Sequence, residues 1–389
     1  MDFGFTHEQL MLRDLARQIL SEQSPPRVVR QLMQDPLGYA EPLWRRLAEV
    51  GFQGLTIDQR FGGQGLGMVE LALVLEEMGR AVYPGPFFAS IVLGVSAIAA
   101  SGDEQAKRAY LPSLASGECK ATLAVLEDSP SWTPRAMKLS ARADAHGWRL
   151  DGLKRFVPFA HVADLILVAA RTSDSDDPAE GVTLFVVERG APGLRLEPNV
   201  EMDLTSRTAT LHLDGVHLGH DAVLGEVDAG WPMLASTLQR AAVGAAAEML
   251  GAARKSLEMS VEHAKVREQF GQPIGAFQAI KHMCAEMLMD VETAHGATYY
   301  AAWALDAEAP DAVLAASVAK AHVGDAARRV CGAAVQVHGG IGFTWEYDLH
   351  LYFKRAKHLE ALYGDSETHR EIAAQHMLQV VEPREPVRV

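Results

Sequence analysis

The first 118 or so residues of the chain carry apolar side chains at helical spacing. In the best-defined stretch they fall at positions i, i+3, i+4 and i+7, namely Leu71, Val74, Leu75 and Met78. Thr6 and Gln9 have the spacing of a capping box, in which two residues satisfy free amide groups at the start of a helix. Prolines separate the helical stretches, at Pro25-Pro26 and at Pro84-Gly85-Pro86. We therefore expect several helices in this part of the chain.

The pattern changes near Ala121, where short apolar runs alternate with Gly, Asp and Pro. These runs are typical of the strands of a compact β domain. They are Thr122–Leu126, Lys138–Arg142, Trp148–Leu150, Leu165–Val168, Thr183–Val187 and Thr210–Leu213.

From about Gly230 the chain becomes rich in alanine and helical again. The long patterned segments are 233–263, 276–305 and 311–337, and the short loops between them favour an antiparallel bundle. We therefore expect a mostly helical α+β fold with three domains. These are an N-terminal α-helical domain (1–119), a central β-barrel-like domain (120–228) and a C-terminal antiparallel four-helix bundle (229–389).

The composition excludes several classes of function. A net charge of -14 argues against nucleic-acid binding, which needs patches of Lys and Arg. No apolar run is long enough to insert into a membrane, and the N-terminus lacks a signal pattern. The 3 cysteines are scattered, and His217-Leu-Gly-His220 has no third ligand at a fixed spacing. We expect a cytoplasmic protein with no metal site.

Two segments of the C-terminal part carry the residues with the clearest chemical meaning. Gln336-Val-His-Gly-Gly-Ile-Gly342 is rich in glycine, and Arg267-Glu-Gln-Phe-Gly-Gln-Pro-Ile-Gly-Ala-Phe-Gln278 combines an arginine with a glycine turn. A dinucleotide pyrophosphate needs cationic and amide donors and close approach of the backbone, which such segments can supply. Taken alone, each segment could equally be a plain loop beside a surface arginine.

Together with three further segments in the right order, these two resemble the acyl-CoA dehydrogenase family over nearly the whole chain. The three further segments are Phe61–Gly79, Gly102–Glu118 and Gly152–Val157. The resemblance implies a flavoprotein that dehydrogenates acyl-CoA thioesters, in which a carboxylate removes the α proton and the β hydride passes to FAD. It also implies that an electron-transfer flavoprotein accepts the electrons.

The resemblance implies which residues contact FAD. The contacts with its adenosine-pyrophosphate half are made to the flavin of a neighbouring subunit, by Arg267, Phe270, Gln336, Gly339 and Gly340, with Phe277 and Gln278 nearby. The further FAD contacts that it implies are Phe156, Val157 and Ser366.

The catalytic carboxylate is missing from both positions at which the family carries it. One position directly follows Tyr363, where this chain has Gly364. The other lies ten residues before the family glycine that matches Gly251, where this chain has Ala241. Neither residue can accept a proton, so no catalytic residue is assigned.

Other acidic residues lie near these two positions. Asp365 and Glu367 follow the first, and we interpret them as charges at a helix N-terminus, although they are also the best candidates for a displaced base. Glu248 is interpreted as a residue on a face of the bundle.

The central domain also departs from the family pattern. Leu126 stands where the family has a threonine, in a segment that wraps the flavin, and Pro158 stands where a Ser or Thr hydroxyl is expected. Proline also lacks an N–H. The flavin contacts made within one subunit are therefore weakened, whereas those offered to a neighbour are intact.

One hypothesis accounts for both losses. The chain resembles the subunits without a catalytic glutamate in heteromeric acyl-CoA dehydrogenases, and it would complete the FAD site of a catalytic sister subunit. Such members act on bulky acyl-CoA substrates, including steroid side-chain thioesters. The alternatives are a self-sufficient homotetramer that uses Asp365 or Glu367 as the base, and a scaffold of the same fold that is not an enzyme.

Overall fold

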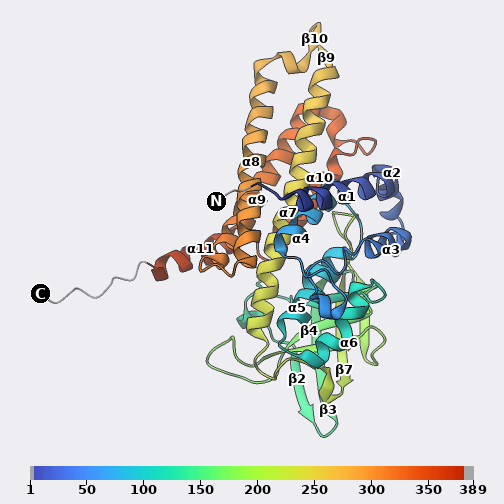
Figure 1. The fold of residues 1–389 in the computed structure, drawn as a ribbon, viewed down its shortest axis with the longest axis vertical. Helices are drawn as coiled ribbons and strands as arrows, with labels where there is room; N and C mark the ends of the chain where they lie inside the picture. Colours follow the sequence, from blue (N-terminus) through green and yellow to red (C-terminus); the bar gives the residue numbers. More distant parts are fainter. Residues whose placement is uncertain (1–3, 381–389) are drawn as a thin grey trace, which may run out of the picture.

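The computed structural model describes residues 4–380, which form a helical part, a β part and a second helical part in chain order (Figure 1). This confirms the mostly helical α+β class predicted from the sequence.

The N-terminal part consists of short helices that pack around one another. Thr6 caps the first of them: its hydroxyl accepts from the amide of Gln9, and the Gln9 side chain accepts from the amide of Thr6, as the spacing predicts. The α-helices are α1 (His7–Gln23), α2 (Pro26–Leu32), α3 (Glu41–Glu49), α4 (Met68–Arg80), α5 (Ser96–Ala100) and α6 (Glu104–Ala115). A wide π-helical stretch, η2 (Phe88–Val95), precedes α5 and was not predicted.

The β part is an eight-stranded mixed sheet with the order β6-β7-β3-β2-β4-β5-β8, in which β1 pairs in parallel with β4. Its strands are β1 (Ala121–Ala124), β2 (Ser140–Asp144), β3 (Gly147–Pro158), β4 (Leu165–Arg171), β5 (Val182–Glu188), β6 (Leu194–Pro198), β7 (Thr208–Leu218) and β8 (Val223–Leu224). The six predicted runs correspond to β1–β5 and β7, while β6 and β8 were missed.

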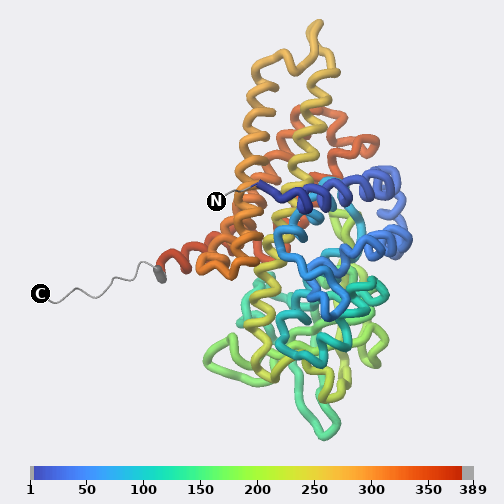
Figure 2. The backbone as a smooth tube through the Cα atoms, in the orientation of Figure 1, coloured from blue at the N-terminus to red at the C-terminus, as the bar shows by residue number. Residues whose placement is uncertain are grey.

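The C-terminal part is built on three long helices, as predicted, and two shorter ones. They are α7 (Trp231–Val266), α8 (Gln278–Asp306), α9 (Ala312–His338), α10 (Leu349–Ala361) and α11 (Ser366–Val380). A two-stranded hairpin of β9 (Glu268–Gln269) and β10 (Gln272–Pro273) joins α7 to α8. In the tube view α7 runs from the β part to the far end of the molecule (Figure 2).

The buried apolar residues form two cores. The larger core is continuous through both helical parts and includes one face of the sheet, to which Leu167 and Leu184 belong. The smaller core lies within the β part and takes the alternate residues of the same strands, such as Ile166 and Phe185. Strand side chains alternate between the two faces of a sheet, so one sheet serves both cores. The interface between the parts is therefore fixed by apolar packing.

Candidate functional site

The ends of α7 and α9 lie side by side at one end of the bundle. The rings of His263 and His338 stack there, with their centroids 4.4 Å apart. Arg267 directly follows α7, and Gln336 lies in the last turn of α9, and both side chains are exposed. The two segments to which the sequence assigns a dinucleotide contact therefore share one end of the bundle.

The β9–β10 hairpin at this end carries a strained and exposed phenylalanine. Phe270 and Gly271 form its two-residue loop, and both have positive φ, 55° and 78°. This combination belongs to type I′ turns, which favour Asn-Gly and not an aromatic residue. Phe270 is 91% exposed, and its ring lies nearly perpendicular to that of Phe277, with 6.1 Å between centroids. Gln278, also exposed, begins α8 beside them. An aromatic ring held in water at a conformational cost indicates a surface that meets a ligand or a partner.

The glycine pair after α9 is not required by the packing of this chain. A Cβ atom on Gly339 or Gly340 would meet no atom within 4 Å. Gly339 has φ 65° and ψ -144°, a conformation that only glycine adopts readily. The backbone here is bare and accessible, as close approach of a phosphate group requires.

Of the other predicted FAD contacts, Phe156 and Val157 lie in the β part, and Ser366 begins α11. A cleft of about 320 Å³ lies between the β part and the end of α10, lined in part by Leu126, Trp132, Phe156 and Leu362. Phe156 sits at a β-bulge with φ 52°, and its ring is half exposed. Val157 is fully buried in the smaller core, so only its backbone is available to a ligand.

This cleft offers few groups that suit a flavin. Pro158, which follows Val157, lines a neighbouring small cavity and not this cleft; its carbonyl accepts the hydroxyl of Thr122 at 2.6 Å, and proline has no N–H to donate. Arg155 and His358 line the cleft, but each lies against an acidic residue that also lines it, Asp128 at 2.7 Å and Glu201 at 3.8 Å, so these donors are already engaged. The bundle end therefore fits the pyrophosphate half of FAD, whereas the cleft of the same chain fits the flavin half poorly.

The loop between α10 and α11 is held in place by two buried side chains. Lys320 donates to the carbonyl of Gly364 at 2.8 Å, and a ring nitrogen of His369 lies 2.9 Å from the carbonyl of Tyr363. Tyr363 and Gly364 have φ of 59° and 93°. A Cβ on Gly364 would lie only 2.9 Å from Nε2 of His369. A side chain at this position, where the family carries its base, would require the His369 ring to move.

Aromatic rings fill the space in front of this loop. Tyr363 stacks on Phe88, with centroids 5.3 Å apart and an angle of 13°, and Trp132 packs against Tyr363 at 5.3 Å. The three rings come from the C-terminal, N-terminal and β parts. The cavity that remains beside them measures about 40 Å³, well below the several hundred cubic ångströms of an ordinary small-molecule site. We refer to Phe88, Trp132 and Tyr363 as the aromatic plug.

The other residues near the expected base positions have structural roles. Ala241 is fully buried in α7. Asp365 is exposed and accepts from the amide of Thr368 at 2.8 Å, a contact that lowers the pKa of its carboxyl. Glu367 is exposed in the first turn of α11. The hydroxyl of Ser366 is buried and donates to the carbonyl of Ala321.

Glu248 is not a residue on a face of the bundle, as interpreted from the sequence, but is buried beside the aromatic plug. Its carboxylate lies 3.2 Å from Arg355, whose guanidinium also donates to Asp203 at 2.8 Å. The same guanidinium donates to the hydroxyl of Thr205 at 2.7 Å and to the carbonyl of Tyr83 at 3.1 Å. Arg355 thus joins acceptors from all three parts of the chain, and we call this group the Arg355 cluster.

Burial raises the pKa of Glu248 to about 7, although the charge of Arg355 opposes the shift. For Asp203 burial also raises the pKa, but the charges of Arg355 and His358 and the hydrogen bonds from Thr205 and Arg355 together outweigh it, and its pKa is lowered. Short-range sequence patterns gave no signal for this cluster, because Arg355 lies 107 residues from Glu248 and 152 residues from Asp203.

The described part of the chain contains neither a metal-ligand cluster nor a membrane-spanning helix. Within residues 4–380 no three His, Cys, Asp or Glu side chains are grouped so that they could hold a metal ion. No helix in the same range is long and apolar enough to cross a membrane.

Family models match three consecutive parts of the chain. They are described as acyl-CoA dehydrogenase N-terminal domain (residues 6–118), middle domain (124–216) and C-terminal domain (228–378). The acyl-CoA dehydrogenase IpdE2 of Mycolicibacterium smegmatis is 31% identical over 92% of this chain and 95% of its own length.

Solved structures of similar fold cover almost all of the chain. Butyryl-CoA dehydrogenase from Megasphaera elsdenii superposes with a TM-score of 0.90 at 28% identity, covering 97% of this chain and 100% of its own. A variant of the Tcur3481-Tcur3483 steroid ACAD gives 0.86 at 31% identity, covering 97% and 99%. The ChsE4-ChsE5 complex from Mycobacterium tuberculosis gives 0.88 at 28% identity, covering 99% and 100%.

Proposed function

The chain belongs to the acyl-CoA dehydrogenase family of FAD-dependent oxidoreductases that act on CH–CH bonds, and from this premise we propose that it is the base-lacking subunit of a heteromeric enzyme. In this role it completes the FAD site of a catalytic sister subunit. The observation that carries the proposal is the loop at Gly364. The residue has positive φ and His369 occupies the space of a side chain, so no base can stand there without rearrangement.

The aromatic plug supports the same conclusion from the side of the substrate. A proton can be removed only if the acyl thioester lies within hydrogen-bond reach of a base. The stacked rings of Phe88 and Tyr363 line a cavity of only about 40 Å³, and Trp132 packs against Tyr363. Ala241, at the other base position, is buried and inert. The chain's own acyl site therefore lacks both the base and the room for a substrate.

The bundle end supports a contribution to a neighbour's cofactor. Bound FAD would supply the hydride-accepting ring, within the sister subunit. The exposed guanidinium of Arg267 would neutralise charge on the pyrophosphate, and the bare backbone at Gly339 and Gly340 would let it approach closely. The exposed Phe270 ring would be covered by the same contact. We propose that Phe277, Gln278 and Gln336 complete this surface.

The self-sufficient homotetramer is the weaker alternative. Asp365 caps α11 and its pKa is lowered, which makes it a poor proton acceptor at neutral pH. The neighbouring Glu367 is exposed in the first turn of the same helix. Replacing Asp365 by Asn and Glu367 by Gln would test this alternative, since a base cannot be removed without loss of turnover.

The substrate and partners follow from the family and its relatives. We propose that the assembled enzyme acts on an acyl-CoA and passes electrons to an electron-transfer flavoprotein. The likeness to a steroid acyl-CoA dehydrogenase and to the ChsE4-ChsE5 complex supports a bulky acyl group and a hetero-oligomer. A scaffold that binds no cofactor is less well supported, because it would leave the accessible Gly339-Gly340 pair without a role.

The proposal is tested by the flavin content and turnover of the chain purified alone. We expect close to no FAD per chain, and no reduction of an artificial electron acceptor with butyryl-CoA or a steroid side-chain thioester. One FAD per chain together with turnover would refute the proposal.

A second test uses the complex, formed by co-expression with family members that carry the catalytic glutamate. Arg267→Ala in this chain should lower the FAD content of the complex. Arg45→Ala serves as the control, because Arg45 is an exposed residue of α3 that pairs with Glu41 one turn away in the same helix.

A further inference from the structure

A cavity of about 570 Å³ lies between the segment that leads into α1 and the last turns of α8. Its volume is within the range of ordinary small-molecule sites. Four aromatic side chains form much of its wall, and we call them the aromatic cage. They are Phe5, Tyr299, Tyr300 and Trp303. Among the described residues that line the cavity there is no Lys, Arg, Asp or Glu.

The rings of the cage stand at different angles around the cavity. Phe5 meets Tyr299 at 70°, with centroids 4.7 Å apart, and Tyr300 meets Trp303 at 37° and 5.7 Å. Residues three and four apart in a helix lie on the same face, so Trp303 lies beside both tyrosines. Trp303 is 40% exposed, so the cavity can be reached from solvent at this ring.

Both tyrosine hydroxyls are already used. The hydroxyl of Tyr299 donates to Glu76 at 2.7 Å, and that of Tyr300 donates to Asp311 at 2.6 Å. A phenol has one proton to donate, so neither hydroxyl can donate to a ligand. The faces of aromatic rings are negative, and these two carboxylates add negative charge behind them. The cage therefore suits a cation better than an anion.

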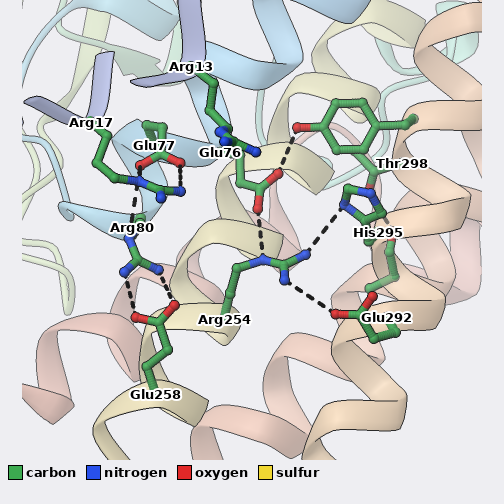
Figure 3. Close-up of polar contacts among 12 residues, drawn as sticks. Arg13, Arg17, Glu76, Glu77, Arg80, Arg254, Glu258, Glu292, His295 and Thr298 are labelled. Carbon is green, nitrogen blue, oxygen red and sulfur yellow. Dashed lines mark hydrogen bonds and ion pairs between the residues drawn. The ribbon is translucent and has the colours of Figure 1, made fainter. Parts of the chain in front are cut away.

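The nearest arginine does not cancel this negative potential. Arg254 of α7 lies 3.4 Å from Nδ1 of His295, a further residue of the cavity wall. The same guanidinium contacts Glu76 at 3.0 Å and Glu292 at 3.3 Å (Figure 3). Two carboxylates thus offset its charge. Burial lowers the pKa of His295, so its ring is neutral at neutral pH and brings no positive charge to the cavity.

We propose that the aromatic cage binds a small organic cation that carries a quaternary ammonium group. Such a cation is attracted to the faces of aromatic rings within about 6 Å. It has no N–H, so it needs no free hydrogen-bond acceptor, and its methyl groups fit an apolar wall. A metal ion such as Mg²⁺ would instead need several oxygen ligands, which aromatic rings do not supply.

This site is separate from the surface assigned to FAD. Gln278 begins α8 at the bundle end, and Trp303 lies in the last turn of the same helix. The roughly 25 residues between them span about 37 Å of helix. Binding at the cage uses none of the residues of the proposed cofactor contact, so the two proposals can fail independently.

The first test compares two ligands of the same shape by isothermal titration calorimetry of the full chain. Choline carries the charge, and 3,3-dimethylbutan-1-ol is its neutral analogue, with carbon in place of nitrogen. We expect choline to bind at least about tenfold more tightly, because only the charged ligand gains the attraction to the rings. Equal affinity for the two would overturn the proposal, and so would no binding of choline at millimolar concentration.

The second test removes one ring and keeps an apolar side chain. Trp303→Leu should weaken choline binding by about tenfold or more, with little effect on the neutral analogue. Trp345→Leu is the matched control, because Trp345 is also exposed, at 55%, and lies outside the cavity wall. It should bind choline as the native chain does. Unchanged binding in Trp303→Leu, or an equal loss in both variants, would overturn the proposal.

A third measurement reports the aromatic environment of the bound cation. Ring currents should shift the N-methyl proton resonance of bound choline upfield in NMR spectra of the native chain. The shift should be smaller with Trp303→Leu, after circular dichroism has shown that this variant is folded. Bound choline without an upfield shift would place the ligand outside the cage and would contradict the assignment.

Discussion

Gly364 has a left-handed backbone conformation, and the ring of His369 occupies the space that a side chain would need. Both features bear on whether one substitution at this residue can restore dehydrogenase activity. We expect Gly364→Glu to give no dehydrogenase activity in the isolated chain. We also expect a loss of about 2–5 kcal/mol of unfolding free energy, from backbone strain and from overlap with His369. Acyl-CoA-dependent reduction of a dye and urea unfolding measure the two effects.

A matched pair of alanine variants separates these two causes. Gly62 has φ 84° and nothing within 4 Å of an added Cβ, so Gly62→Ala reports strain alone. Gly364→Ala should cost more than Gly62→Ala, because it adds the overlap with His369. Equal losses of unfolding free energy in the two variants would show that the His369 ring moves aside without cost.

Glu248 makes stability depend on pH in the direction opposite to that of an ordinary surface carboxylate. Its pKa is raised to about 7 in the folded chain from the ordinary value of 4.5, so the folded state holds a proton that the unfolded state releases. The resulting stabilisation is present below pH 4.5 and is lost as pH rises to about 7; it is at most about 3 kcal/mol. Glu248→Gln removes this titration.

We therefore expect the difference in unfolding free energy between Glu248→Gln and the native chain to change with pH. The unfolding free energy of Glu248→Gln relative to the native chain should increase between pH 5 and pH 8, as measured by urea denaturation at each pH. A difference that stays constant over this range would contradict the assigned pKa.

At the scale of elements, we expect the β9–β10 hairpin to lower the stability of the chain while contributing to the proposed cofactor contact. Asparagine tolerates positive φ better than phenylalanine, and Asn-Gly is the preferred type I′ pair. Phe270→Asn should therefore increase the unfolding free energy of the isolated chain by about 1 kcal/mol, since the exposed ring contributes little packing. This increase should appear as a higher thermal midpoint. The same variant should lower the FAD content of the complex with the sister subunit. A variant that retains the full flavin content would exclude Phe270 from the cofactor contact.

The elements also show where sequence patterns suffice and where they fail. The segments 233–263, 276–305 and 311–337 were found to within a few residues, because long amphipathic helices with Gly or Pro at their ends carry a strong periodic signal. Strand β6 was missed because it is a short edge strand that is mostly exposed. The residues on which the proposed lack of a base rests, Gly364 and Ala241, could be read from the sequence. The aromatic plug was not, since its three rings come from distant segments that only the fold brings together.

At the scale of the whole molecule, the Arg355 cluster is expected to control how the three parts unfold. Arg355→Met would leave the buried carboxylates of Asp203 and Glu248 without their cation, which costs about 3–5 kcal/mol for a buried pair. We expect the variant to unfold at lower urea and in more than one step, followed by fluorescence and circular dichroism together. The exposed Arg46–Glu49 pair provides the control, and Arg46→Met should cost less than about 1 kcal/mol. A small effect at both sites would mean that apolar packing alone joins the parts.

The position of Arg355 along the chain bears on how the protein is made. Its acceptors at Tyr83, Asp203 and Glu248 all emerge from the ribosome before it does. Until residue 355 of 389 has been synthesised, the first two-thirds of the polypeptide hold acidic groups that cannot be buried without cost. The three parts of the nascent chain therefore cannot pack around the Arg355 position until that residue has been added. A message truncated before this codon should yield a product that chaperones retain and proteases remove.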